Sequence, residues 1–191
     1  MEDLSQKTII LASKSPRRKE LLSALGLTFK TDVKEVDESY PDTMNGAAVA
    51  LYIAGKKAEA FDVVYDNELV ITADTIVCVD DLILGKPKDY DEAFQMLTRL
   101  SGKRHEVITG VALKTRDRIR TFHEVTAVYF NQLNDEQIKY YIENFEPYDK
   151  AGAYGIQEWI GAVAVRHIDG SYTNVMGLPT AKLYNELIKL L

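Results

Sequence analysis

The segment "LASKSPRRKE" (residues 11–20) places two arginines at the predicted start of a helix. Ser15 is a favourable N-cap residue, and Pro16 suits the first helical position. Arg17 and Arg18 follow in the first turn, where the helix dipole disfavours a cation by about 0.3–1 kcal/mol. A bound anion would reverse this penalty, because backbone N–H groups and guanidinium groups both bind phosphate oxygens. The segment therefore predicts an anion site, and the alternative is a solvated basic face paired with nearby acids.

Three carboxylates form the second group of candidates. Asp37 and Glu38 lie in "VDES", and Asp74 lies in "ADT" directly after "ELVIT". We expect all three near the ends of strands, which is where ligands bind to open α/β sheets. Glu38 and Asp74 could hold a Mg²⁺ ion that bridges phosphates, or Asp74 could act as a general base towards water. The alternative for Asp37 and Glu38 is a role as ordinary turn acids.

Two glycine-containing segments could complete a phosphate and base site. Lys86 lies in "LGKP", where Gly permits close approach and Pro stiffens the chain around a cation. In "DKAGAYGIQ" (residues 149–157), Tyr154 could stack on a base and the Gln157 amide could pair with a base edge. Either segment could instead be a structural turn, and neither matches a dinucleotide fingerprint or a P-loop.

The sequence offers little support for other kinds of catalysis. Its three histidines, His105, His123 and His167, do not form an HExxH motif, and its one cysteine cannot form an internal disulfide. We expect Cys78, between two valines, to be a buried apolar thiol. His105 and His123 fall in a predicted hairpin, which indicates structural roles.

Composition narrows the class of protein. The 191 residues are 46% hydrophobic, which is enough for one substantial core, and we expect a single domain over residues 1–191. The formal charge of −6 argues against a protein that binds nucleic acid, and it leaves room for a local basic cluster that binds phosphate. The sequence has no apolar run of about 18 residues and no signal peptide, so we expect no membrane partner and a cytoplasmic location.

Helices and strands alternate in a mixed order. Besides the helix that starts at Pro16, helices are predicted at 45–61, 89–102, 134–144 and 178–191. Strands are predicted at 8–13 and 27–36, twice within 68–87, as a hairpin within 105–130, and twice within 161–177. This order favours an α/β fold with a mixed central β-sheet flanked by helices.

The order and spacing of several blocks resemble one known family. The blocks are "LASKSPRRKELL", "VDES", "ADTIV", "LGKP", "MLTRLSGKRHEVITGVAL", "DKAGAYGIQ" and "VMGLP". Together they resemble the Maf family of nucleoside triphosphate pyrophosphatases, from about Ile9 to Leu183. The resemblance implies two lobes with a cleft, a fold related to inosine triphosphatases, and hydrolysis between the α and β phosphates with a divalent metal, Mg²⁺ or Mn²⁺.

The resemblance also implies roles for individual residues. Asp74 matches the family's proton acceptor, and the family's polar cleft positions correspond to Ser13, Arg17, Arg18, Glu38, Lys56 and Lys86. We expect catalysis from Asp74, Glu38 and Lys86, with Glu38 and Asp74 as metal ligands.

Within the family, the branch acting on dTTP and UTP carries "SPRR", "ADT" and "YGIQ", as this chain does. The specificity positions of that branch correspond to Arg17, Thr75 and Gln157, and a Gln amide suits the edge of a pyrimidine. The chain departs from the family pattern directly afterwards, because Glu158 and Trp159 follow where Gly is usual.

Two further points follow from the same resemblance and sequence. The resemblance implies a house-cleaning role in the nucleotide pool, and the rival hypothesis is a non-enzymatic protein that binds a nucleotide or a division protein and inhibits septum formation. The segment "YYIENF" and the apolar stripe of the last predicted helix leave a homodimer open.

Overall fold

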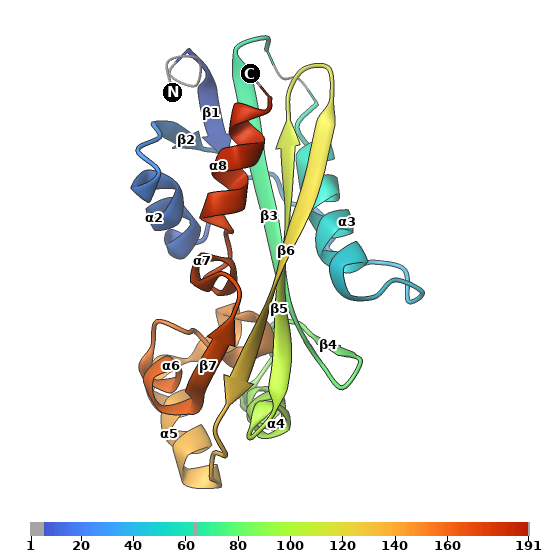
Figure 1. Ribbon diagram of the computed structural model, residues 1–191. Helices are drawn as coiled ribbons and strands as arrows, with labels where there is room; N and C mark the ends of the chain where they lie inside the picture. Colours follow the sequence, from blue (N-terminus) through green and yellow to red (C-terminus); the bar gives the residue numbers. More distant parts are fainter. Residues whose placement is uncertain (1–5, 63–64, 191) are drawn as a thin grey trace. The chain divides into compact units, whose positions relative to one another are not determined.

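The computed structural model describes residues 6–62 and 65–190. It contains a seven-stranded sheet with the order β2-β1-β3-β5-β6-β7, in which β4 pairs with β3 off this path (Figure 1). The strands are β1 (Thr8–Leu11), β2 (Phe29–Thr31), β3 (Glu68–Val79), β4 (Leu82–Leu84), β5 (Arg104–Lys114), β6 (Ile119–Phe130) and β7 (Val165–Asp169). Because β1 pairs in parallel with β2 and β3, whereas β3–β4 and β6–β7 are antiparallel, the sheet is mixed. The predicted α/β class is confirmed.

Helices lie between these strands along the chain. The longer ones are α2 (Pro16–Ala24), α3 (Gly46–Glu59), α4 (Tyr90–Leu100), α5 (Asp135–Phe145) and α8 (Thr180–Ile188). Shorter helical segments are η1 (Pro147–Asp149), η2 (Ala151–Ala153), α6 (Trp159–Ala164) and α7 (Tyr172–Val175). The five predicted helices and the predicted hairpin, now β5 and β6, are therefore confirmed, as are the two strands around Asp80 and Asp81, whose positive φ angles form the turn.

Two strand predictions are wrong in extent or in type. The strand predicted over 27–36 covers only Phe29–Thr31, because its neighbour β1 ends at Leu11 and offers no pairing partner beyond Thr31. The segment 161–177 holds one strand, β7, and not two. Residues before β7 belong to α6 and residues after it to α7, where the Ser171 side chain caps the helix by accepting the N–H of Asn174.

The chain divides into two compact units, each assembled from separated stretches. Unit 1 contains the chain up to Asp74, residues 109–124 and the chain from Gly177 onward. Unit 2 contains residues 75–108 and 125–176. The strands β3, β5 and β6 contribute to both units, so neither unit is a continuous segment. The single-domain prediction over residues 1–191 stays a prediction.

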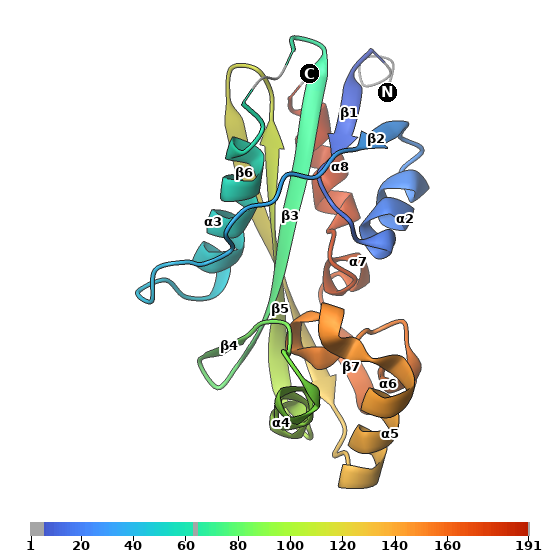
Figure 2. The same cartoon turned by 180° about the vertical axis from the view of Figure 1, so that it is seen from behind.

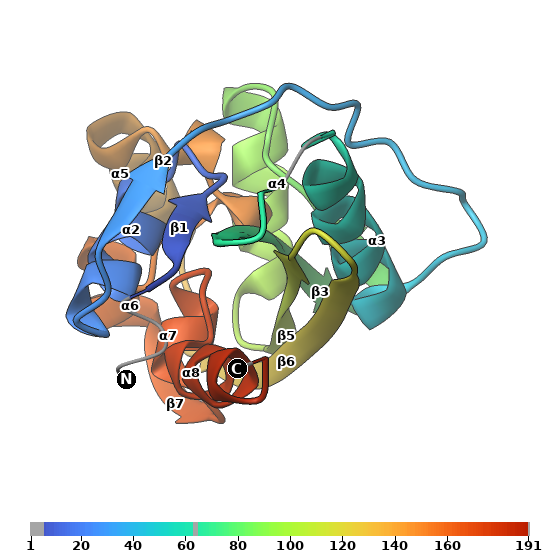
Figure 3. The same cartoon turned by 90° about the horizontal axis from the view of Figure 1, so that it is seen from above.

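In unit 1, helices cover both faces of the sheet. Figure 3 shows α3 on one face and α8 on the other. The close approach of α3 to β5 depends on Gly110, because a Cβ there would lie 2.4 Å from the carbonyl carbon and oxygen of Ala50. Small side chains continue this contact at Ala54, Ala58 and Ala112. The tight packing fixes the last turn of α3 against the sheet.

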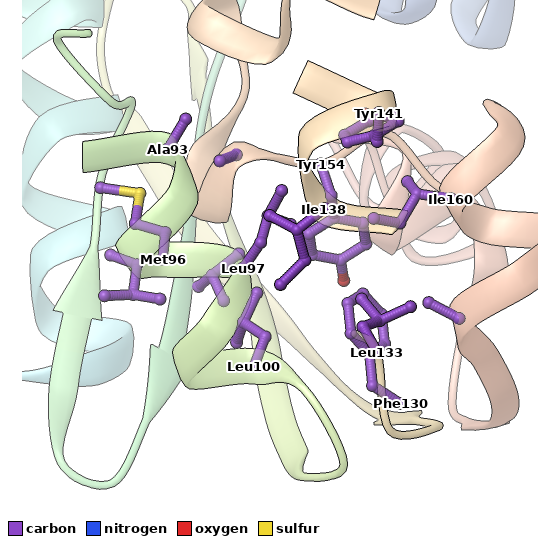
Figure 4. Packing of buried hydrophobic residues seen from close by; sticks show 14 of the residues in the cluster. Ala93, Met96, Leu97, Leu100, Phe130, Leu133, Ile138, Tyr141, Tyr154 and Ile160 are labelled. Atoms are coloured by element: carbon purple, nitrogen blue, oxygen red, sulfur yellow. The ribbon is translucent and has the colours of Figure 1, made fainter. Parts of the chain in front are cut away.

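In unit 2, the core lies among α4, α5, α6 and the adjacent strands (Figures 2 and 4). α4 contributes Leu97 and Leu100, α5 contributes Ile138 and Tyr141, and all four side chains are fully buried. Their spacing along each helix is the i, i+3 pattern of an amphipathic face. Burial of each large apolar side chain contributes about 1.5–3 kcal/mol, so this core holds the loops of unit 2 on a rigid base.

Candidate active site

Asp74 lies inside a strand and not at its end, which corrects the sequence prediction. β3 runs without interruption from Glu68 to Val79. Its parallel neighbour β1 is shorter, since the last register pair is Leu11 with Ile71. Asp74 therefore lies three residues beyond the last residue that pairs with β1. With respect to β1, its position resembles the end of a strand, although β3 itself continues. The sequence prediction also placed Asp37 and Glu38 at the end of a strand, and that is wrong because β2 has already ended at Thr31.

Lys57 joins the two carboxylates that the sequence singled out. Its Nζ lies 2.7 Å from Oδ1 of Asp74 and 2.9 Å from Oε1 of Glu38. The side chains of Lys57 and Asp74 are only 15% and 13% exposed, so water screens their interaction less than it screens a surface pair. The ammonium group thus fixes the orientation of both carboxylates within unit 1.

The position of Lys57 follows from the helix that carries it. The buried face of α3 includes Ala50, Ile53 and Ala54, and Lys57 lies one turn after the last two on the same face. The helix is tied to β3 by Thr72, whose hydroxyl donates to the carbonyl of Ala54 at 2.6 Å. The family resemblance pointed to the neighbouring Lys56 and did not include Lys57, which the spacing from the apolar residues Ile53 and Ala54 places on the buried face of α3.

Lys56 faces a different group of side chains. Its Nζ donates to the carbonyl of Ser39 at 3.2 Å, lies 3.6 Å from Asp37, and sits 5.5 Å from the ring centre of Tyr52. Hydrogen bonds from Ser39 lower the pKa of the exposed Asp37 carboxyl, and the charge of Lys56 adds to this effect. Lys56 therefore supports the loop that leads to Glu38, and its predicted role in substrate binding stays a prediction.

The two arginines lie at the start of α2 as predicted. The Ser15 side chain accepts the N–H of Arg18 at 3.4 Å, and Pro16 occupies the first helical turn. The Arg18 side chain turns back into unit 1, where its Nε donates to the carbonyl of Gly177 at 2.7 Å. Burial lowers the pKa of Arg18, the charge of Asp74 opposes this, and the charge of Arg17 lowers it further.

Several of the predicted site residues of unit 1 lie close to Arg18. Arg18 lies near Asp74, Glu38 and Arg17 closely enough for each charge to act on its pKa. Ser13 is buried directly before the helix, and its hydroxyl accepts the N–H of Ser15 at 3.2 Å. The unfavourable cations at the helix start are thus partly balanced by acids from β3 and the loop after β2.

The remaining predicted residues, Thr75, Lys86 and Gln157, belong to unit 2. Thr75 is half-buried in β3, whereas Lys86 and Gln157 are exposed. The two loops that carry Lys86 and Gln157 are joined, because the N–H of Gly152 donates to the carbonyl of Gly85 at 3.0 Å. Unit 2 therefore holds a lysine and an amide side chain on two connected loops.

Tyr154 and His105 form a buried pair beneath the second of these loops. The Tyr154 hydroxyl lies 2.8 Å from Nε2 of His105, and burial raises the pKa of Tyr154 while lowering that of His105 to about 3. Tyr154 is therefore a core residue and is not available to stack on a base, which corrects one sequence interpretation. The structural role predicted for His105 agrees with its burial. Cys78 is only half-buried, and burial raises its pKa to about 11.

Two carboxylates of unit 1, those of Glu38 and Asp74, are the candidate ligands for a divalent metal. Across residues 6–62 and 65–190, no group of three or more His, Cys, Asp or Glu side chains is arranged to hold a metal ion. Mg²⁺ and Mn²⁺ in nucleotide sites need only one or two carboxylates, because phosphate oxygens and water complete the shell. Glu38 and Asp74 already converge on one cationic group, so their donor chemistry fits such an ion.

Comparison with known proteins places the chain in a family. A family model described as "Maf-like protein" matches residues 8–190. The chain belongs to the Maf family. It is 54% identical over 192 residues to a dTTP/UTP pyrophosphatase of Phocaeicola vulgatus, with full coverage of both chains. It is 51% identical over 181 residues to a dTTP/UTP pyrophosphatase of Flavobacterium psychrophilum, covering 94% of this chain and 93% of that protein.

Solved structures extend the likeness at the level of the fold. A HAM1 protein from Coxiella burnetii superimposes on this Maf chain with a TM-score of 0.51 at 15% identity, covering 96% of this chain and 99% of the other. At this identity the likeness shows a shared fold alone. In the described part of the chain, no helix is long and apolar enough to cross a membrane.

Proposed function

We propose that this Maf protein hydrolyses dTTP and UTP between the α and β phosphates, giving the nucleoside monophosphate and pyrophosphate. The observation that carries the proposal is the cluster in which Lys57 binds both Asp74 and Glu38 beside Arg18. Relatives about half identical over essentially the full chain are named dTTP/UTP pyrophosphatases, which supports the choice of substrate.

Phosphate binding is assigned to Arg17, Arg18 and Lys86. Arg17 and Arg18 lie at the N-terminus of α2, where the helix dipole favours an anion. Guanidinium groups bind phosphate oxygens in pairs, and Lys86 adds a point charge on the loop after β4. Together these groups would neutralise a triphosphate and stabilise the charge that develops on the leaving pyrophosphate.

Asp74 is the proposed base. A water molecule loses a proton to its carboxylate, and the water oxygen forms a bond to the α phosphorus. The bond between the α phosphorus and the bridging oxygen breaks, and pyrophosphate leaves with the electron pair. Lys57 holds Oδ1 of Asp74 at 2.7 Å and so restricts the carboxylate to one orientation. Positioning and electrostatic stabilisation supply most of the rate in reactions of this type.

We assign a Mg²⁺ or Mn²⁺ ion to Glu38 and Asp74. When bound, such an ion supplies Lewis-acid polarisation of phosphate oxygens and neutralises part of their charge. Glu38 is the more exposed of the two carboxylates, at 48% of its side chain, and so is the more accessible to an ion that arrives with a nucleotide.

Base selection is assigned to Thr75 and Gln157, with Arg17 as a third contributor. The exposed Gln157 amide carries one acceptor and two donors, which can pair with a carbonyl and an N–H of uracil or thymine. We further propose a cytoplasmic location, since the substrates belong to the nucleotide pool, and a house-cleaning role there.

A panel of nucleotides tests the proposal. Purified protein is incubated with Mg²⁺ or Mn²⁺ and each of the common nucleoside triphosphates, and pyrophosphate is measured separately from orthophosphate. We expect pyrophosphate from dTTP and UTP at higher kcat/KM than from purine nucleotides. Orthophosphate alone would contradict the proposed bond cleavage. Neither product from any nucleotide would favour the rival hypothesis of a binding protein that inhibits septum formation.

A further inference from the structure

The turn that carries Gln157 is closed by a backbone hydrogen bond. The N–H of Glu158 donates to the carbonyl of Gly155 at 3.0 Å, so Gln157 occupies the third position of a four-residue turn. Gln157 is exposed while Gly155 and Ile156 before it are buried. The direction of the Gln157 amide therefore depends on how firmly this turn is held to the core of unit 2.

Tyr141 of α5 holds both ends of the turn. Its hydroxyl accepts the N–H of Gly155 at 3.0 Å and donates to Oε2 of Glu158 in a short hydrogen bond. The Tyr141 side chain is fully buried among the core residues of Figure 4. A phenol that is enclosed by core packing is a firm support, because closely packed side chains sit in rotamer minima with few voids around them.

The other carboxylate oxygen of Glu158, Oε1, forms an ion pair with Lys150. Nζ of Lys150 lies 3.1 Å from Oε1 of Glu158 and 2.6 Å from Oδ1 of Asp149, and the Lys150 side chain is only 8% exposed. A buried lysine is retained where its charge is paired, since an unpaired buried charge is costly. Lys150, Glu158, Tyr141 and Gly155 thus form one continuous set of polar contacts, called here the Glu158 network.

Gly155 and Glu158 also fit each other sterically. A Cβ at residue 155 would lie 2.8 Å from the carboxylate carbon of Glu158, so the carboxylate lies directly over the glycine. Gly161, in the first turn of α6, permits a second close contact, because a Cβ there would lie 1.8 Å from the carbonyl oxygen of Ile156. The backbone on each side of Gln157 is therefore clamped by packing as well as by hydrogen bonds.

We infer that the Glu158 network positions Gln157 for recognition of the nucleobase, with Glu158 and Tyr141 as positioning residues for substrate selection. The inference rests on the proposed function, in which Gln157 contacts the base. Neither Glu158 nor Tyr141 touches the substrate, and both act by fixing the turn.

Two variants and two matched controls test the inference. Glu158→Gln removes the charge that pairs with Lys150, and Tyr141→Phe removes both hydrogen bonds of the phenol. Tyr140→Phe alters an exposed tyrosine next to Tyr141, and Glu136→Gln alters an exposed acid on the same helix. The readout is the ratio of kcat/KM for dTTP to that for dCTP, whose base has an amino group in place of one carbonyl.

For Glu158→Gln and Tyr141→Phe we expect this ratio to fall about five- to tenfold, which is the effect of losing one well-placed hydrogen bond. The loss should reside in KM for dTTP, with kcat within about twofold of the unmodified protein. The control variants should keep the ratio. A role confined to folding would lower the melting temperature without moving the ratio, and that result would overturn the inference.

A double-mutant cycle shows whether Glu158 acts through Gln157. In a Gln157→Ala background, Glu158→Gln should cause no further loss of the dTTP to dCTP ratio, since the residue that it positions is gone. Full additivity of the two losses would overturn the inference.

A binding measurement separates this inference from the proposed function. Calorimetric titration with dTMP, which carries the base without the reacting phosphates, should give weaker binding to Glu158→Gln and Tyr141→Phe than to the unmodified protein and the controls. If no pyrophosphate is released from any nucleotide but this weakening is seen, the proposed function fails and the positioning role stands. If pyrophosphate is released but both ratio and dTMP binding are unchanged in the variants, the positioning role fails.

Discussion

Nζ of Lys57 lies 2.7 Å from Oδ1 of Asp74, and the same ammonium group contacts Glu38 at 2.9 Å. One cation from the last turn of α3 therefore orients a carboxylate from the middle of β3 and another from the loop after β2. This three-residue contact lies within unit 1, and it holds the Asp74 carboxylate in one orientation inside a strand that is otherwise largely buried.

Replacing Asp74 tests the assignment of the base. We expect Asp74→Asn to lower kcat for pyrophosphate release from dTTP by about 10²- to 10⁴-fold, because the amide cannot accept the proton of water. The variant should fold, since asparagine keeps the size of the side chain, and circular dichroism checks this. Near-normal turnover in a folded variant would show that another group takes the proton.

Replacing the two adjacent lysines separately distinguishes their roles. We expect Lys57→Met to lower kcat/KM for dTTP about ten- to hundredfold, in line with the loss of a charge-assisted hydrogen bond to Asp74. Lys56→Met should have a smaller effect, since Lys56 contacts Ser39 and Asp37. Equal losses in the two variants would contradict the assignment of Lys57 as the residue that orients Asp74. The comparison uses initial rates at matched protein concentration and metal.

Lys86 is expected to act on substrate binding more than on the chemical step. Lys86→Ala should raise KM for dTTP several-fold and lower kcat less, because a point charge on an exposed loop binds phosphate in the ground state as well as in the transition state. Lys88→Ala, which removes an exposed lysine two residues away, is the control. An unchanged KM in Lys86→Ala would place Lys86 outside the site.

The burial of His105 predicts a dependence of stability on pH. Burial lowers the pKa of His105 from the ordinary 6.5 to about 3, so the imidazole binds a proton more readily in the unfolded chain. The contribution of this residue to stability is present above pH 6.5 and is lost as the pH falls towards 3, at about 1.4 kcal/mol per pH unit. Urea unfolding at pH 7.5 and pH 5 measures the change, and His105→Gln should lose less stability over this interval than the unmodified protein. An identical loss in both proteins would show that His105 is protonated in the folded state.

Two glycines of unit 1 should respond to alanine in opposite ways. Gly110→Ala should destabilise the protein by about 1–3 kcal/mol, because its Cβ would meet the backbone of Ala50 at 2.4 Å. Gly55→Ala should stabilise it by about 0.5–1 kcal/mol, since Gly55 is inside α3 and a Cβ there meets no atom within 4 Å in the described chain. Thermal unfolding of both variants checks the two signs.

Most features of the fold that were predicted correctly from the sequence depend on residues that are close together in the chain. Ser15 and Pro16 define the start of α2, and the two aspartates at 80 and 81 define the turn between β3 and β4 because their positive φ angles suit such residues. The two arginines at the start of α2 and the two carboxylates that Lys57 contacts were also singled out from the sequence. These features depend on residues close together in the chain, and so a single sequence can reveal them.

Features that depend on distant partners were not found. The short length of β2 is set by the end of β1, and the path of β3 through Asp74 is set by neighbours on the sheet. Tyr154 could not be identified as a core residue from its loop alone, because its partner His105 is 49 positions away. Lys57 was also not found, but it differs from these cases because its spacing from the apolar residues Ile53 and Ala54 can be read from the sequence.

The interleaving of the two units has a consequence for synthesis on the ribosome. All stretches of unit 2 have been made once residue 176 is added, whereas unit 1 still lacks the segment that begins at Gly177 and includes α8. Arg18 must also wait, because the carbonyl that its Nε binds belongs to Gly177. The sequence of unit 2 is therefore complete before that of unit 1, and the hydrogen bond from Arg18 to Gly177 is among the last contacts of unit 1 that the growing chain can make.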